Sequence, residues 1–383
     1  MDWKVPLTEL SYGPEEEQAV LDVIKSKWLT MGAVTEKFEH DFRIFMHSKH
    51  AIAVANATEA LHMACLVLGV GPGDEVIVPS LSFVATANAV LYTGANVVFA
   101  DITSPQKPTI SLRDIVKKAT PKTKAIIVMH YAGYPCDMAE IYHFARTHNI
   151  FVIEDAAHAP GAITKGEYIG SYGDIGCFSF FSNKNIATGE GGMLTTQDDE
   201  IARRLRFLRS HGMTSLTYDR HQGHAYSYDV VALGYNYRID EIHAALGIEQ
   251  LKKLFNNNHK RGLANYLYRI GLATTVEVPF TKFKERSAFH LFPILLPVGA
   301  NRQAFQEYMK EQGIQTSIHY PPIHLFSYYK NRYPIDHELP ITEDYAAREV
   351  TLPLFPTITH EQIDYVCEHV KKGLSTAHEV ISA

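Results

Sequence analysis

The sequence predicts an α/β fold built on a large, doubly wound, mostly parallel sheet, followed by a smaller α+β domain. Seven short apolar runs rich in β-branched residues lie between residues 51 and 196, and helical or turn segments separate them. Such alternation is typical of a parallel sheet with helices on both faces. The chain has 383 residues, 46% of them hydrophobic, which is enough for a large core and a second domain.

The elements follow in chain order. We expect strands at 51–55, 75–79, 96–101, 125–130, 151–155, 176–181 and 192–196. A helix that ends at Gly69 is indicated by the stripe Leu61, Ala64, Cys65 and Leu68, and a second helix is expected at 199–209.

The pattern changes after a long helical stretch that begins near Ile239. We expect a strand at 289–296, a helix at 302–312, a strand at 315–320 and a last helix at 360–374. The sequence therefore predicts a large domain over residues 1–255 and a small one over 256–383.

Composition excludes several function classes. The net charge is −6 and no basic stretch interleaved with aromatic residues occurs, so we expect no nucleic acid partner. No apolar run approaches the ~18 residues that span a bilayer, and the first residues lack a signal-peptide profile. We therefore expect no membrane association and a cytoplasmic protein. The four cysteines lack CxxC spacing and predict free buried thiols, and the histidines do not form a convincing metal-ligand pattern.

Lys184 lies between an apolar run and a glycine cluster that includes Gly189 and Gly192. Such a lysine is often only a loop charge. Here, however, Asp155 ends an apolar run 29 positions earlier (184 − 155 = 29). Together they resemble the two fixed points of a pyridoxal-phosphate enzyme, a lysine that forms an imine and a carboxylate that pairs with the pyridine nitrogen.

The chemistry requires both side chains. The lysine must lose its proton readily to attack an aldehyde, and partial burial lowers its pKa. The carboxylate keeps the ring nitrogen protonated, so the ring can accept electrons. The end of a buried strand is the usual place for such a group in an open α/β sheet.

A phosphate site is expected nearby, where the run 51–55 passes into a helix. Asn56 and Glu59 have the spacing of a capping box, and free N–H groups at the helix start would face an anion. This segment alone is equally consistent with a purely structural cap.

A series of motifs resembles the DegT/DnrJ/EryC1/StrS family of sugar-nucleotide aminotransferases over about residues 10 to 375. The motifs are Trp28–Gly32, Asn56–Thr58, Pro79–Asn88, Glu154–Ala159, Phe178–Gly192, Gly234–Arg238 and His319–His324. The resemblance implies a fold-type I pyridoxal-phosphate enzyme that cycles through pyridoxamine phosphate. It also implies a homodimer with shared active sites and an N-terminal segment at the active site.

The resemblance also implies roles for single residues. Lys184 would bind the cofactor and move the proton between carbon atoms, and Asp155 would pair with the ring nitrogen. Other cofactor contacts would come from Asn56, Ala57, Thr58, Phe83, His158, Ser179 and, from the other subunit, Asn236. Substrate contacts would come from Thr30, Arg238, Tyr320 and His324.

Two departures from the family pattern stand out. Ala57 replaces a common glycine but keeps the backbone N–H. The segment between Tyr218 and Tyr228 matches no assigned motif and is interpreted as a variable substrate loop.

We expect amino transfer from L-glutamate to a keto group on a nucleotide-linked sugar, giving an amino-sugar nucleotide for surface polysaccharide, lipopolysaccharide or a glycosylated metabolite. Three alternatives stay open: a keto-cyclitol or free keto-sugar as acceptor, a pyridoxamine-dependent dehydration, and a regulatory protein that binds the cofactor without turnover. A lysine at 184, where the family's dehydratases have histidine, favours transamination over dehydration.

Overall fold

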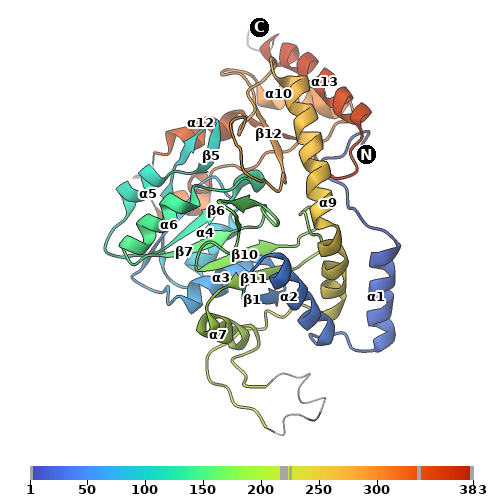
Figure 1. Ribbon diagram of the computed structural model, residues 1–383. Coiled ribbons are helices and arrows are strands. Elements are labelled where there is room, and N and C mark those ends of the chain that lie inside the picture. Colours follow the sequence, from blue (N-terminus) through green and yellow to red (C-terminus); the bar gives the residue numbers. More distant parts are fainter. Residues whose placement is uncertain (1–2, 216–222, 224–226, 334–337, 380–383) are drawn as a thin grey trace.

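The computed structural model describes residues 3–215, 223, 227–333 and 338–379 (Figure 1). Most of the unassigned segment between Tyr218 and Tyr228 lies outside these residues.

The main sheet contains all seven strands that the sequence predicts, in the order β1-β11-β10-β7-β6-β2-β3. Strand β11 is antiparallel to both of its neighbours, and the pairs from β10 to β3 are parallel. The carboxyl ends of the parallel strands therefore meet at one edge of the sheet. The strands are β1 (His50–Val54), β2 (Glu75–Pro79), β3 (Asn96–Ala100), β6 (Thr123–Met129), β7 (Phe151–Asp155), β10 (Ile175–Ser179) and β11 (Gly192–Thr196).

Helices cover both faces of this sheet, which confirms the doubly wound architecture. Successive residues of a strand point to opposite faces, so Ala51 and Ala53 of β1 join one core cluster while Ile52 and Val54 join another. The first cluster lies under α2 (Ala33–Phe45), α5 (Leu112–Lys118), α6 (Met138–Thr147) and the first half of α9 (Glu241–Leu272). The second lies under α3 (Ala57–Val67), α4 (Ala85–Leu91) and α7 (Asp199–Arg209).

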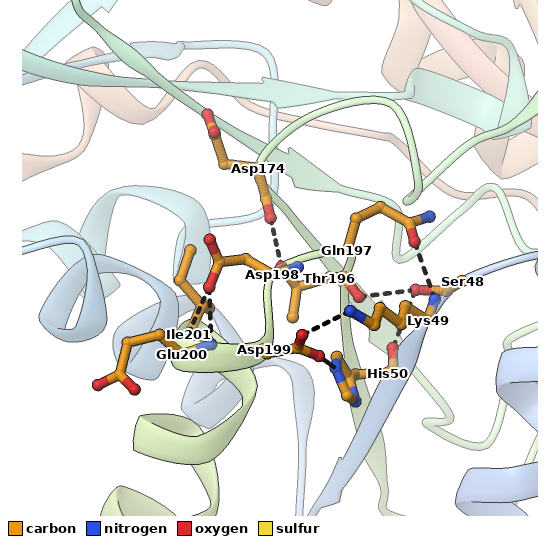
Figure 2. Close-up of polar contacts among 10 residues, drawn as sticks. All are labelled: Ser48, Lys49, His50, Asp174, Thr196, Gln197, Asp198, Asp199, Glu200 and Ile201. Atoms are coloured by element: carbon orange, nitrogen blue, oxygen red, sulfur yellow. Dashed lines mark hydrogen bonds and ion pairs between the residues drawn. The ribbon is translucent and has the colours of Figure 1, made fainter.

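Polar contacts fasten the start of α7 to the β1–β11 edge of the sheet (Figure 2). Asp198 caps α7 by accepting the backbone N–H groups of Glu200 and Ile201 at 2.8 and 2.9 Å. Asp199 pairs with Lys49 and His50 across the strand ends at 2.5 and 2.6 Å. Because the Asp199 side chain is 70% exposed, these ion pairs add little stability, and the cap is the stronger local determinant.

Two N-terminal helices, α1 (Pro14–Ser26) and α2, pack along α9. The sequence analysis did not predict either of them. Buried Glu241, the first residue of α9, accepts the backbone N–H groups of Gly32, Val34 and Thr35 at 2.8, 2.8 and 2.9 Å. The start of α2 is thus capped by a residue more than 200 positions away.

The C-terminal part packs around a third core cluster beside the far end of α9 (Figure 1). The elements of this C-terminal part include a two-stranded antiparallel sheet of β12 (Phe292–Leu295) and β13 (Glu349–Leu352), together with α10 (Arg302–Glu311) and α13 (His360–Glu379). Residues of α9 up to Leu254 join the first cluster, and those from Ala264 join the third. Residue 255 falls inside this continuous helix, and the division into two domains there stays a prediction.

One predicted strand is wrong. Residues 315–320 do not form a strand, and Ser317 makes only an isolated bridge to Thr351. The Gln315 side chain instead accepts the backbone N–H of Leu7 at 2.9 Å. Single backbone contacts to Val5 and Thr351 hold the segment, and these do not amount to a strand.

Shorter elements are β4 (Ile102–Ser104), β5 (Lys107–Ile110), β8 (Ile163–Thr164), β9 (Glu167–Tyr168), α11 (Ser327–Arg332), α12 (Pro340–Arg348) and the two 3-10 helices η1 (Tyr131–Gly133) and η2 (Ile323–Leu325). All four cysteines are buried and free, as the sequence predicts. Within the described residues, no helix has the length and apolar character needed to cross a membrane.

Candidate active site

A cavity of about 850 Å³ opens at the edge of the main sheet where the parallel strands end. The loops that follow β7 and β10 and the start of α3 form its walls. This cavity is lined by nine of the residues that the sequence predicts at the active site: Asn56, Ala57, Thr58, Phe83, Asp155, His158, Ser179, Lys184 and Tyr320.

Lys184 lies in the turn after β10, where its backbone N–H donates to the Phe181 carbonyl at 2.8 Å. Desolvation in the cavity lowers the pKa of its amine to about 8, although the Asp155 carboxylate opposes this shift. At neutral pH an appreciable fraction of the amine is therefore unprotonated, which suits a nucleophile that attacks an aldehyde.

Asp155 ends β7 and is buried. Its carboxylate accepts the Thr86 hydroxyl at 2.7 Å and the Ala157 N–H at 3.2 Å. Burial raises the pKa of this carboxyl group, and no Lys, Arg or His of the described residues forms an ion pair with it. A buried carboxylate without a cation partner fits a protonated pyridine nitrogen, which would supply the missing positive charge.

The start of α3 forms an anion cradle. Asn56 caps the helix by accepting the Glu59 N–H at 2.9 Å, and the Glu59 carboxylate accepts the N–H of Ala55 at 3.2 Å. The N–H groups of Ala57 and Thr58 have no acceptor among the described residues, so they are available to a phosphate. Ala57 is the first residue of α3, a conformation that alanine adopts readily.

Gly192 lets β11 approach this cradle closely. A Cβ atom at this position would lie 2.6 Å from the carbonyl carbon of Asn56 and 2.9 Å from the nitrogen of Ala57. Any side chain here would push β11 away from the start of α3, so the glycine serves the geometry of the phosphate site.

Three rings, those of Phe83, His158 and Tyr320, line the same cavity. Phe83 is 57% exposed although it is aromatic, and its ring centroid lies 6.1 Å from that of Tyr320. Tyr320 in turn bonds His158 Nε2 at 2.9 Å. The Nδ1 atom of His158 is buried without a partner among the described residues. An unpaired polar atom beside an aromatic ring is what a cavity shaped for a flat, polar heterocycle would contain. The residues present therefore fit pyridoxal phosphate.

Four expected residues do not line the cavity of the single chain. Thr30 and Asn236 are exposed and Arg238 is half-buried. His324 bonds Ser80 at 2.6 Å and Glu343 at 3.2 Å. The roles of all four stay predictions.

Other cavity residues were not assigned a site role from sequence. They are Glu59, Leu61, Ala85, Tyr92, Met129, Ala157, Phe181, Asn183, Glu190, Tyr237 and His319. A signal was present for most of them, because they stand in the quoted motifs (Ala85, Ala157, Phe181, Asn183, Glu190, Tyr237 and His319) or in the quoted capping box (Glu59). Leu61, Tyr92 and Met129 lie in a helix, at a helix end and in a strand, and no quoted site motif contains them.

The N-terminal segment lies against the Lys184 loop. The Tyr12 hydroxyl donates to the Ala187 carbonyl at 2.7 Å, and Thr8 lies beside Asn183 and His319 in a small adjoining cavity.

The fold and the Lys184–Asp155 pair define a pyridoxal-phosphate-dependent enzyme. Residues 11–371 match the DegT/DnrJ/EryC1/StrS aminotransferase family, and the chain belongs to this family of sugar aminotransferases.

Two curated relatives are similar to this chain over nearly their whole length. The spore coat polysaccharide biosynthesis protein SpsC of Bacillus subtilis is 38% identical over 94% of each chain. The GDP-perosamine synthase of Escherichia coli O157:H7 is 37% identical over 97% of this chain and 99% of the relative.

Among solved structures, the putative sugar aminotransferase Spr1654 of Streptococcus pneumoniae superposes with a TM-score of 0.92 at 27% identity, covering 100% of both chains. Forms of that protein with pyridoxal phosphate and with pyridoxamine phosphate have been solved, which supports the same cofactor here. The fold-type I architecture is thereby confirmed.

Proposed function

We propose that the protein transfers the amino group of L-glutamate to a keto group on a nucleotide-linked sugar, as a homodimer with shared active sites. The observation that carries this proposal is the placement of Lys184 and Asp155 on the wall of one large cavity. Bound pyridoxal phosphate supplies the electrophilic carbon and the electron-accepting ring.

Residues of this chain bind the cofactor and transfer the proton. The N–H groups at the start of α3 hold the phosphate, and Asp155 holds the proton on the ring nitrogen. Phe83 and His158 fix the plane of the ring. The Lys184 amine, with its lowered pKa, takes and returns the proton at the carbon atom that loses or gains nitrogen.

The size of the cavity supports a large substrate. About 850 Å³ lies near the upper end of the ~300–1,000 Å³ range typical of ligand pockets. The cavity has to hold the cofactor together with the substrate, and this volume leaves room for a substrate larger than a small keto acid. The names of the two relatives, one a polysaccharide biosynthesis protein and one a synthase of a GDP-linked amino sugar, point the same way.

The charge of the cavity supports a second subunit. Its charged lining residues within the described chain are Glu59, Asp155, Glu190 and one cation, Lys184. A substrate with two phosphates needs more positive charge than this. Arg238 lies outside the cavity of its own chain, in a region that exposes the apolar side chains of Val231 and Leu233. A second copy covering these side chains would bring Asn236 and Arg238 to its neighbour's cavity.

The product would feed a surface polysaccharide or lipopolysaccharide, and we place the reaction in the cytoplasm, as the sequence predicts.

The test uses the purified enzyme loaded with pyridoxal phosphate. Addition of L-glutamate should convert the absorbance of the lysine-bound cofactor to that of pyridoxamine phosphate. Keto-sugars linked to UDP, dTDP, GDP or CMP should reverse the change with multiple turnovers, and free keto-sugars and keto-cyclitols serve as comparison. No spectral change with any amino acid, or turnover with free sugars only, would overturn the proposal. Binding without turnover would indicate a regulatory protein.

A further inference from the structure

Asn185 follows Lys184 directly in the chain, and its side chain is bonded to segments that are distant in sequence. The residue is only 4% exposed. Its Nδ2 atom donates to the Ala288 carbonyl at 2.7 Å and to Oδ1 of Asn258 at 2.7 Å. Its Oδ1 atom lies 2.9 Å from Nδ1 of His290. Both hydrogens of this amide and its oxygen therefore have partners inside the protein.

Two backbone carbonyls fix the direction of these bonds, because a carbonyl oxygen can only accept. Nδ2 of Asn258 donates to the Pro160 carbonyl at 2.9 Å, so Oδ1 of Asn258 faces Asn185. The Asn185 group between this oxygen and the Ala288 carbonyl is then the NH2 group. The opposite orientation of either amide would place its oxygen against a carbonyl oxygen. Oδ1 of Asn185 is left to accept the Nδ1–H of His290 in either charge state of that ring.

These bonds join two loops of the active site through α9. Pro160 lies in the loop that follows Asp155 at the end of β7, and Asn185 lies in the turn after β10, next to Lys184. Asn258 belongs to α9 and bonds both segments. Strands β7 and β10 are neighbours in the sheet. The spacing of the two loops beyond the sheet edge therefore depends on an amide bridge from α9.

The same amide also holds a ring that packs on the wall of the cavity. His290 is 3% exposed, and its ring centroid lies 4.2 Å from that of His158. Because Nδ1 of His290 donates to Asn185, the ring cannot turn away from His158 without losing this bond. Burial lowers the pKa of both imidazoles well below the usual range, so two neutral rings pack here without charge repulsion.

We propose that Asn185 and Asn258 are positioning residues, which hold the Lys184 turn at a fixed distance from the loop after β7. The inference rests on the proposed roles of Lys184 and Asp155, which would bind opposite ends of one rigid cofactor from these two loops. Such a cofactor is bound tightly only when the spacing of its two attachment points is already correct. Neither asparagine lines the main cavity, so both act through their neighbours.

The test compares Asn185→Ala, Asn258→Ala, the double variant and the control Asn265→Ala. Asn265 is another asparagine of α9, and it is 3% exposed. Its Nδ2 atom donates to the Tyr134 hydroxyl at 3.2 Å, and its Oδ1 atom accepts from Arg269 at 2.8 Å. Asn265→Ala therefore removes a comparable set of buried hydrogen bonds from the same helix and leaves both loops connected.

The readout is binding of pyridoxal phosphate to the cofactor-free protein, which requires no amino transfer. Asn185→Ala and Asn258→Ala should each raise the dissociation constant of the cofactor about tenfold. The double variant should bind no more weakly than Asn185→Ala, because the two side chains form one connection. Asn265→Ala should keep the wild-type dissociation constant, even though its melting temperature falls as much as those of the other single variants.

Unchanged dissociation constants in both single variants, or an equal increase in Asn265→Ala, would overturn the proposal. Losses that multiply in the double variant would overturn it too, because the two asparagines would then act separately. If Asn185→Ala does not fold, Asn258→Ala decides, since it leaves the bonds of Asn185 to Ala288 and His290 in place. If the wild-type enzyme transfers no amino group, the proposed function fails, but the dissociation constants still decide the role of the bridge.

Discussion

The Nε2 atom of His158 lies 2.9 Å from the hydroxyl of Tyr320, so two residues 162 positions apart form one wall of the cavity. Burial lowers the pKa of His158 well below its usual range and raises that of Tyr320. Both groups are therefore neutral, and the tautomer of His158 decides which of them donates. The Nδ1 atom of His158 is buried without a partner among the described residues.

Replacement of Tyr320 by phenylalanine removes the hydroxyl that bonds Nε2 of His158. We expect kcat to fall about tenfold with little change in melting temperature, because the ring still packs against Phe83. Steady-state kinetics and thermal unfolding check this. Tyr329→Phe is the control, since its hydroxyl bonds Asn88 at 2.6 Å and does not line the cavity. Equal losses in the two variants would contradict the assignment.

The lowered pKa of Lys184 predicts the pH dependence of cofactor loading. Below pH 8 most of the amine is protonated and cannot attack the aldehyde, so the loading rate of cofactor-free enzyme should rise about tenfold per pH unit and level off near pH 8. A lysine at its usual pKa would show no plateau before about pH 10. Stopped-flow absorbance measures this rate. A rate that keeps rising beyond pH 9 would contradict the shift.

Asp155→Asn should abolish most amino transfer while the protein still binds the cofactor. The amide cannot hold a proton on the ring nitrogen, so we expect both half-reactions to slow by at least about 100-fold. Thr86→Ser keeps the hydroxyl that donates to Asp155 and is the matched control. Borohydride reduction and peptide mapping should place the cofactor on Lys184 in all these proteins. Rapid turnover by Asp155→Asn would contradict the role proposed for the Asp155 carboxylate.

Glu241→Ala should destabilise the fold by about 2–4 kcal/mol, because three N–H groups at the start of α2 lose a charged, buried acceptor. Denaturant unfolding measures the change. Asp199→Ala removes an exposed ion-pair partner and should leave stability unchanged within error. A similar loss in both variants would argue against distant capping of α2.

Leu233→Asp should disrupt the proposed dimer and its activity together. The Leu233 side chain is 85% exposed near Arg238, and a carboxylate at an apolar contact between subunits is strongly unfavourable. Light scattering should report monomers, and activity should fall to less than about a tenth. Val298→Asp changes a side chain that is 80% exposed elsewhere and should leave both properties intact. A monomeric but fully active Leu233→Asp protein would show that the active sites are not shared.

Much of the fold was predictable because the signals are local. All seven strands of the main sheet and the helix at 199–209 were recognised from apolar runs and periodicity that their own residues carry. The strand predicted at 315–320 does not form, because the neighbouring segments offer it only single bridges. Helices α1 and α2 were missed, and α2 depends on Glu241, a cap that no local pattern contains.

The family, the sheet strands, and the Lys184 and Asp155 side chains on which the cofactor chemistry depends could all be recognised from the amino-acid order. Folding was needed to show that Asp155 has no cation partner among the described residues, that His158 contacts Tyr320, and that Thr351 bonds both Glu349 and His319. Residue types and local periodicity can be read along the chain. By contrast, the pKa of a buried group and the direction of its hydrogen bonds depend on atoms that only folding brings within a few ångströms.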